Sequence, residues 1–68
     1  MKYTLEFLDS QLYDLEHEAD KQGYNLSDDE NYINACWIVT NADFENKKEI
    51  DGTEFYKLFD LVVEKLDL

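Results

Sequence analysis

Residues 4–23 read TLEFLDSQLYDLEHEADKQG and contain a regular ladder of leucines. The apolar residues of this ladder are spaced three and four positions apart: Leu5, Leu8, Leu12, Leu15 and Ala19. Because an α-helix turns once in about 3.6 residues, this spacing places them on one face. The segment therefore predicts an amphipathic helix from Thr4 to Gln22. Gly23 follows at the position where a left-handed residue commonly ends a helix.

A second interpretation of the N-terminus places a short strand over residues 2–7. Tyr3, Leu5 and Phe7 alternate along the chain and would share one face of that strand. The helix would then begin at Asp9 or Ser10. The leucine ladder crosses this break without interruption, which favours a single helix.

A second helix is predicted over residues 28–41. Ser27 followed three residues later by Glu30 is typical of a capping box, and acidic residues suit the positive end of a helix dipole. The continuous apolar run at residues 35–39, ACWIV, also fits a buried strand near 35–40. The capping signal favours the helix.

A third helix is predicted over residues 52–67, after a second capping pair, Asp51 with Glu54. Its apolar stripe comprises Phe55, Leu58, Phe59, Val62 and Leu66. We therefore expect an all-α, three-helix domain spanning residues 1–68. The alternative is a small α+β domain with short strands near 2–7 and 35–40.

The charge balance limits the class of partner. The chain contains seventeen acidic residues but only six lysines and no arginine, which gives a formal net charge of −11. Such a surface repels nucleic acid and anionic membranes and attracts basic proteins. We expect a basic protein partner, with no direct binding to nucleic acid and no membrane contact. Cys36 is the only cysteine, which indicates a reducing compartment and predicts a cytoplasmic protein.

A row of acidic residues runs along one flank of the first predicted helix. Its members step by three and four positions, with one tyrosine among them: Glu6, Asp9, Tyr13, Glu16 and Asp20. Charges held in a row on a rigid helix can imitate a phosphate backbone, which carries roughly one charge per 1.7 Å in duplex DNA. Asp28, Asp29 and Glu30 would extend this row. These eight residues form the predicted partner-binding set. The helix-1 flank is its centre, because Asp28 and Glu30 are already explained as helix-start residues.

These features predict a non-enzymatic inhibitor or modulator that docks on a basic, nucleic-acid-binding protein. The chain is similar in size and charge to small phage anti-restriction and anti-CRISPR proteins, some of which act as DNA mimics. Its lysine-only cationic set and its Asn- and Tyr-rich composition are typical of AT-rich genomes, including those of phages. No motif predicts a catalytic residue or a cofactor.

Two other hypotheses compete with this one. Residues 43–54 resemble a degraded EF-hand loop, with acidic residues at most ligand positions: Asp43, Glu45, Glu49, Asp51 and Glu54. Lys47 and Lys48 occupy the positions of an oxygen ligand and of the turn glycine, so no metal ligands are predicted. The third hypothesis is a helical dimeric adaptor that associates through apolar residues lying off the main stripes.

Three further side chains invite a chemical role. His17 lies among acidic residues and is expected at the surface, since no second metal ligand is suitably spaced. Cys36 lies in the most apolar stretch and is expected to be a buried, inert thiol. Trp37 is expected in the core or at an interface.

Overall fold

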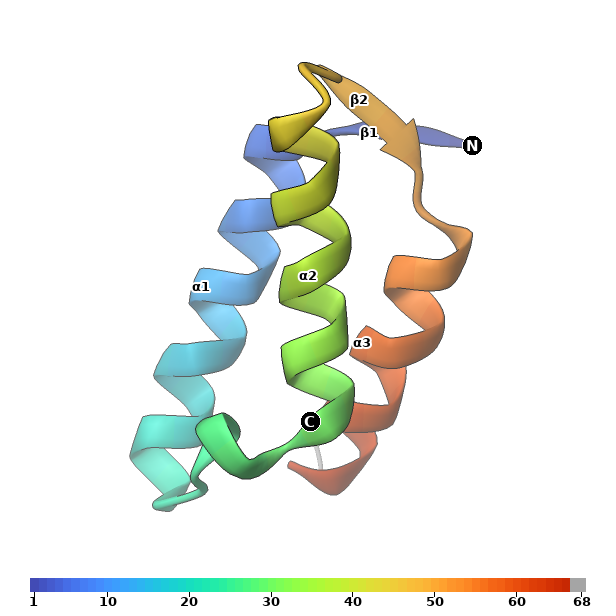
Figure 1. Ribbon diagram of the computed structural model, residues 1–68. Coiled ribbons are helices and arrows are strands. Elements are labelled where there is room, and N and C mark those ends of the chain that lie inside the picture. The colour runs from blue at the N-terminus through green and yellow to red at the C-terminus, as the bar shows by residue number, and fades with distance from the viewer. Residues whose placement is uncertain (67–68) are drawn as a thin grey trace.

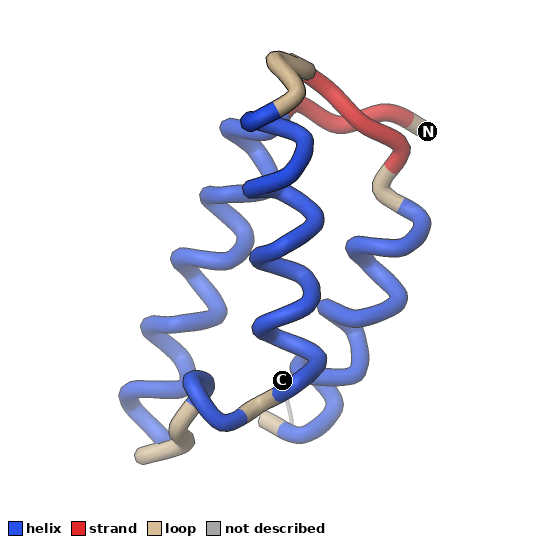
Figure 2. The backbone as a smooth tube through the Cα atoms, in the orientation of Figure 1, coloured by secondary structure: helices blue, strands red, loops and turns tan. Residues whose placement is uncertain are grey.

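The computed structural model describes residues 1–66 and consists of three helices with a small two-stranded sheet at one end (Figure 1). The elements follow in the order β1 (Lys2–Thr4), α1 (Leu5–Gln22), the 3₁₀ turn η1 (Leu26–Asp28), α2 (Glu30–Phe44), β2 (Glu49–Asp51) and α3 (Thr53–Lys65). The prediction of a small, mainly helical domain is confirmed. The helices lie alongside one another, and the sheet joins the N-terminus to the α2–α3 connection (Figure 2).

Helix α1 begins and ends where the sequence predicts. The Thr4 hydroxyl oxygen caps its start by accepting a hydrogen bond from the Phe7 N–H at 3.2 Å. Gly23 ends the helix with φ at 70°, in the left-handed region that glycine adopts without steric cost. The N–H groups of Gly23 and Tyr24 then bond to the last carbonyls of the helix.

The predicted capping box at the start of α2 is wrong. Asp29 is the N-cap, and its Oδ1 accepts bonds from the N–H groups of Asn31 and Tyr32 at 2.9 and 3.2 Å. Ser27 instead donates its backbone N–H and its hydroxyl to the Asn25 side chain. Because residues 26–28 form the turn η1, α2 starts at Glu30, two residues later than predicted.

Helix α2 also continues past its predicted end, to Phe44. Asn46 follows in the left-handed conformation, with φ at 60°. The N–H groups of Asn46 and Lys47 bond to the carbonyls of Asp43 and Ala42, each at 2.9 Å, which is the Schellman arrangement. The apolar run at 35–39 lies inside this helix, so the alternative strand near 35–40 does not form.

Part of the alternative strand near 2–7 does form. Strand β1 covers only Lys2–Thr4 and pairs antiparallel with β2, with Tyr3 opposite Ile50. These two residues are half-buried while their strand neighbours are exposed. A strand at 49–51 was not predicted, because three residues carry too little pattern to identify one.

Helix α3 begins at Thr53, close to the predicted start. Asp51 accepts bonds from the Thr53 N–H at 2.9 Å and from its hydroxyl at 2.5 Å. Gly52 is the N-cap residue of this helix, and Asp51 is the last residue of β2. The predicted Asp51–Glu54 pair therefore begins one residue too early to form a capping box. The helix ends at Lys65, and residue 67 of the predicted range lies outside the described residues.

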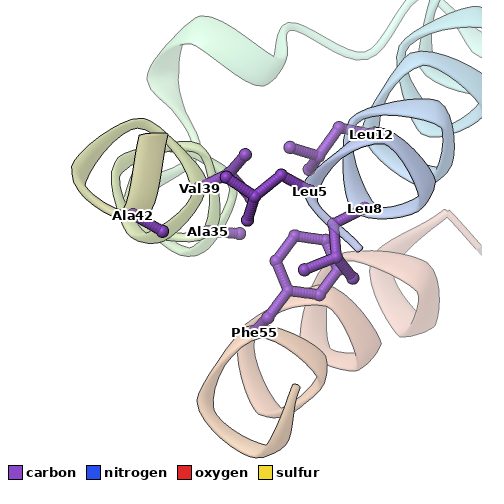
Figure 3. Close-up of a cluster of buried hydrophobic side chains, with 7 residues drawn as sticks. All are labelled: Leu5, Leu8, Leu12, Ala35, Val39, Ala42 and Phe55. Atoms are coloured by element: carbon purple, nitrogen blue, oxygen red, sulfur yellow. The ribbon is translucent and has the colours of Figure 1, made fainter. Parts of the chain in front are cut away.

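The core forms two adjoining clusters between the helices. The first cluster, shown in Figure 3, contains Leu5, Leu8, Leu12, Ala35, Val39, Ala42 and Phe55. The second cluster contains Leu15, Ala19, Leu26, Val62 and Leu66. The leucine ladder of α1 contributes to both clusters, so the predicted apolar face of this helix is confirmed.

Replacing Gly52 with alanine is expected to destabilise the protein by about 1–3 kcal/mol. A Cβ at this buried position would lie only 2.5 Å from the Tyr3 ring, which would have to move away from Tyr56. Thermal or denaturant unfolding followed by circular dichroism measures the loss. Gly23→Ala is the comparison, because its Cβ would meet nothing within 4 Å and its positive φ alone would cost about 1 kcal/mol. An equal or smaller loss for Gly52→Ala would contradict the close approach to Tyr3.

Candidate interaction surface

The acidic flank predicted on helix 1 exists as one continuous strip of α1. Its residues are all exposed and lie beside the buried leucine face: Glu6, Asp9, Tyr13, Glu16 and Asp20. From Glu6 to Asp20 the strip extends about 21 Å along the helix, at a rise of about 1.5 Å per residue. Within this strip, the Tyr13 side chain is 60% exposed. We call these five residues the acidic flank.

The acidic flank forms one wall of a shallow groove between α1 and α2. The hollow has a volume of about 290 Å³ and is lined by Asp9, Leu12, Tyr13 and Glu16 from α1 and by Tyr32, Cys36 and Thr40 from α2. A second hollow continues it past Glu16 and Asp20 toward η1. The structure thus brings Asp9, Tyr13, Glu16 and Asp20 together at this groove, while Glu6 lies at the far end of the flank.

The α2 wall supplies contacts that the sequence did not reveal. The Tyr32 hydroxyl donates a hydrogen bond to Glu16 across the groove. Burial, together with this bond, raises the pKa of Tyr32 well above its usual range, so the phenol stays protonated and keeps donating. This bond holds the Glu16 carboxylate in a fixed position beside the groove.

Cys36 lies at the base of the same groove and is half-buried rather than buried. Burial raises the pKa of its thiol, and the negative charges of Glu16 and Asp9 raise it further. Because the thiolate is the reactive form, this environment makes Cys36 a poor nucleophile. The expectation of an inert thiol therefore agrees with its surroundings.

The lysines of the chain leave the acidic flank without neutralising partners. Three of them form ion pairs elsewhere: Lys21 with Glu18, Lys47 with Glu45, and Lys65 with Asp29. Over residues 1–66, no lysine lies within 4.0 Å of a flank carboxylate. The negative potential of the flank therefore reaches solvent with little internal compensation.

His17 is exposed, as expected, and belongs to the same side of α1. Its ring meets the Tyr13 ring edge-on, with centroids 4.5 Å apart and an interplanar angle of 80°. Together with Glu16 and Asp20, the two rings line a small hollow. The flank is therefore a mixed surface of carboxylates and flat rings.

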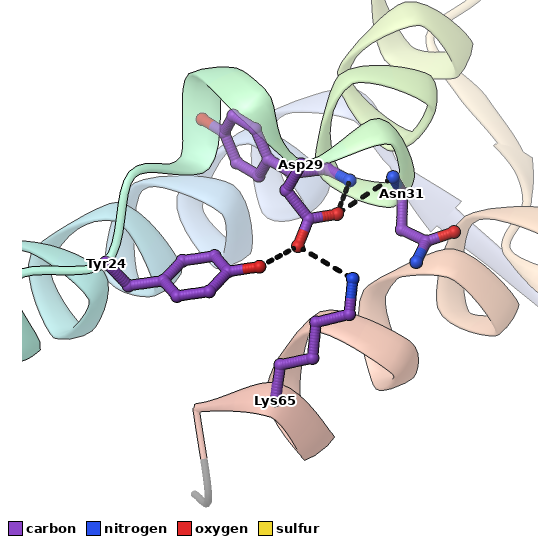
Figure 4. A network of polar contacts seen from close by, with 5 residues as sticks. Tyr24, Asp29, Asn31 and Lys65 are labelled. Carbon is purple, nitrogen blue, oxygen red and sulfur yellow. Dashed lines mark hydrogen bonds and ion pairs between the residues drawn. The ribbon is translucent and has the colours of Figure 1, made fainter.

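Asp29 does not belong to the exposed set in which the sequence placed it. Its side chain is fully buried and accepts four hydrogen bonds, two of them from the start of α2 (Figure 4). The Tyr24 hydroxyl donates at 2.6 Å and Lys65 Nζ at 3.3 Å. Burial opposes its charge, but these bonds together lower the pKa of the Asp29 carboxyl. Asp29 is thus a structural residue that ties α2, α3 and the α1–α2 connection together.

Asp28 and Glu30 remain exposed on either side of Asp29. Asp28 accepts a bond from the Asn25 amide at 3.1 Å, inside the η1 turn. Leu26 and Ser27 of this turn line the hollow that also contains Asp20, whereas Asp28 and Glu30 do not line it. Seven of the eight predicted site residues therefore stay available to a partner.

The segment that resembles an EF-hand loop is divided among several elements. Asp43 lies in α2, and Glu45 forms an ion pair with Lys47 at 2.9 Å. The Asp51 carboxylate accepts the hydrogen bonds from Thr53 described above. The strand β2 fills the middle of the segment and pairs with β1. Among the described residues, no group of three or more metal-ligating side chains gathers at one point.

Comparison with family models, with curated proteins and with solved structures returns no match for this chain. Fold and surface alone define it as a small acidic helical domain. In residues 1–66, no helix combines the length and the apolar character that crossing a membrane requires.

Proposed function

We propose that this protein is a small acidic interaction domain that docks on a basic, nucleic-acid-binding surface of another protein and blocks or modulates it. The observation that carries this proposal is the acidic flank: a row of exposed carboxylates on a rigid helix, none paired with a lysine within residues 1–66. Basic grooves that bind nucleic acid are built to accept such rows of negative charge.

The carboxylates and the aromatic rings of this groove would contribute to docking in different ways. The carboxylates would steer the two proteins together and raise the association rate at low ionic strength. Tyr13 and the half-buried Tyr32 offer flat, amphipathic rings in the same groove, the kind of side chain enriched at binding hot spots. A basic surface carrying both cations and a shallow apolar ridge fits this groove best.

The setting of this activity is part of the proposal. The single cysteine supports a reducing cytoplasm, and the composition supports a phage-type inhibitor acting on a host or competing protein. In such a role the domain would occupy the nucleic-acid site as a mimic, without binding nucleic acid itself.

Neutralising the acidic flank tests the proposal. The variant carries Glu6→Gln, Asp9→Asn, Glu16→Gln and Asp20→Asn, which keep side-chain size and hydrogen-bonding capacity. Partners are captured from host lysate on the wild-type protein, eluted with a salt gradient, and then titrated with both proteins in purified form. We expect the variant to bind at least tenfold more weakly, since each charge contributes about 0.5–1 kcal/mol. Duplex DNA should compete for the same partner surface.

A matched control separates the flank from overall charge. The changes Asp14→Asn, Asp43→Asn, Asp60→Asn and Glu64→Gln also remove four negative charges, so both variants carry a net charge of −7 instead of −11. These four residues are exposed and lie outside the acidic flank. The control is expected to bind within about threefold of the wild type. Equal losses in both variants, or binding insensitive to salt, would overturn the proposal.

A further inference from the structure

Helix α2 carries large apolar side chains on the face that points away from the core. Ile33, Trp37 and Phe44 are 48%, 60% and 86% exposed, whereas Ala35, Val39 and Ala42 on the opposite face are buried. Spacings of four and seven residues place the three exposed side chains within roughly 40° of one another around the helix. We call them the outer stripe. It is about 16 Å long, at about 1.5 Å per residue.

Ile33 and Trp37 of the outer stripe lie in an uncharged stretch of a strongly charged protein, whereas Phe44 stands between Asp43 and Glu45. Residues 31–42 contain no Asp, Glu, Lys or Arg, while the chain as a whole carries −11. Glu30 and Asp43 stand just beyond the two ends of this interval. Around Ile33 and Trp37, a second acidic molecule could therefore approach this exposed face without placing like charges in direct contact.

We propose that the outer stripe is a self-association surface on which two copies of this chain pack α2 against α2, antiparallel, around a two-fold axis. In such an isologous contact, each residue pairs with a different residue of the other copy, and the pairing is reciprocal. Placing Ile33 opposite Phe44 of the second copy brings Trp37 opposite Thr40, so the two tryptophans flank the axis. Ile33 and Phe44 then each gain an apolar neighbour, and the two Trp37 rings lie close to the axis.

The charges at the ends of α2 select the antiparallel direction. Asp28 and Glu30 stand at its N-terminal end. Lys47 and Lys48 follow its C-terminal end, among Asp43, Glu45 and Glu49, and Lys47 pairs with Glu45 within the same chain at 2.9 Å. The same register that pairs Ile33 with Phe44 places Glu30 beside the segment carrying Lys47 of the second copy. A parallel arrangement would instead bring acid to acid and lysine to lysine. Antiparallel helix dipoles also attract each other at their ends.

Salt distinguishes this association from docking on a basic partner. Two molecules that each carry −11 repel at long range, and added salt screens that repulsion. Self-association should therefore strengthen as ionic strength rises, whereas binding through the acidic flank should weaken. Failure of one proposal is thus visible separately from failure of the other.

Sedimentation equilibrium of the purified chain tests the dimer directly. We expect a concentration-dependent monomer–dimer equilibrium at about 0.5 M NaCl that shifts toward monomer at about 0.02 M. Trp37 is the only tryptophan, so its fluorescence should shift to the blue as the dimer forms. Trp37→Ala and Phe44→Ala should each weaken dimerisation at least tenfold. Leu61→Ala, which removes a 42% exposed apolar side chain from α3, should leave it unchanged.

A charge exchange tests the register. Glu30→Lys alone and Lys47→Glu alone should each weaken the dimer severalfold, and the double variant should recover most of the loss. A monomer at every concentration and salt, or a dimer indifferent to Trp37 and Phe44, would overturn the proposal. Binding of a basic amphipathic helical peptide to a chain that stays monomeric would likewise overturn it, because the stripe would then serve another protein.

Discussion

Phe55→Ala is expected to destabilise the protein by about 3–5 kcal/mol. The Phe55 side chain is fully buried in the first core cluster, where it packs against the leucines of α1 (Figure 3). Its ring also stacks on that of Phe59, with the ring centroids 5.6 Å apart. A domain of this length has a total stability of roughly 3–10 kcal/mol. The variant should therefore lose most of its helical signal at 37 °C, which circular dichroism measures.

Phe44→Ala is the matched control for Phe55→Ala, because it removes the same ring from an 86% exposed position. At concentrations where the chain is monomeric, its stability should lie within about 0.5 kcal/mol of the wild type. Phe55→Leu keeps most of the buried volume and should fall between the two. A loss for Phe44→Ala comparable to that for Phe55→Ala would show that the core is not where the structure places it.

The strongly periodic parts of the fold were predictable from sequence alone. The ladder from Leu5 to Ala19 repeats over several turns, and only one face of one helix satisfies it. Gly23 and Thr4 added end signals that agree with the ladder. Where the periodicity and the capping residues agree, as in α1, local sequence is enough to predict the bounds of the helix and its buried face.

The start of α2 shows why other boundaries could not be predicted. Ser27, Asp28 and Asp29 are all competent N-caps, and each is followed by acidic or polar residues. Asp29 is selected because its carboxylate also reaches Tyr24 and Lys65, the latter 36 residues away. A contact at that sequence distance leaves no local pattern.

The outer stripe could not be predicted from the sequence. The apolar run at residues 35–39, which fits either a helix or a buried strand, does not show which of its residues face solvent. With apolar residues on both faces, the segment lacks a single dominant period. Once Ala35 and Val39 are known to face the core, the outward position of Trp37 follows from helix geometry. The groove behind the acidic flank depends on that same phase, because Tyr32 and Cys36 form its α2 wall.

Asp29→Ala is expected to destabilise the protein by about 2–4 kcal/mol at neutral pH. The change removes the cap of α2 and leaves the Tyr24 hydroxyl without its acceptor, while Lys65 loses its ion pair (Figure 4). Asp28→Ala, on the neighbouring exposed carboxylate, should cost less than about 1 kcal/mol. Urea unfolding of the two variants side by side measures the difference, and similar losses would argue against the network.

Asp29→Asn removes the charge but keeps the cap of α2, because the amide oxygen can still accept from the N–H groups of Asn31 and Tyr32. The amide NH2 group would then face Tyr24 and donate to its hydroxyl instead of accepting from it. The pKa of Asp29 is lowered in the folded state, so its carboxylate stabilises the fold above the unfolded value of about 3.9. That stability is lost as the pH falls through the lowered folded pKa. The wild type should therefore be more stable than Asp29→Asn at pH 7, and the gap should close as the pH falls from the unfolded value of about 3.9 through the folded pKa. Protonation of the other carboxylates relieves repulsion in both proteins equally, so the difference between the two unfolding curves reports Asp29 alone. A gap that stays constant from pH 7 to about pH 2 would mean that the charge of Asp29 adds nothing to its hydrogen bonds.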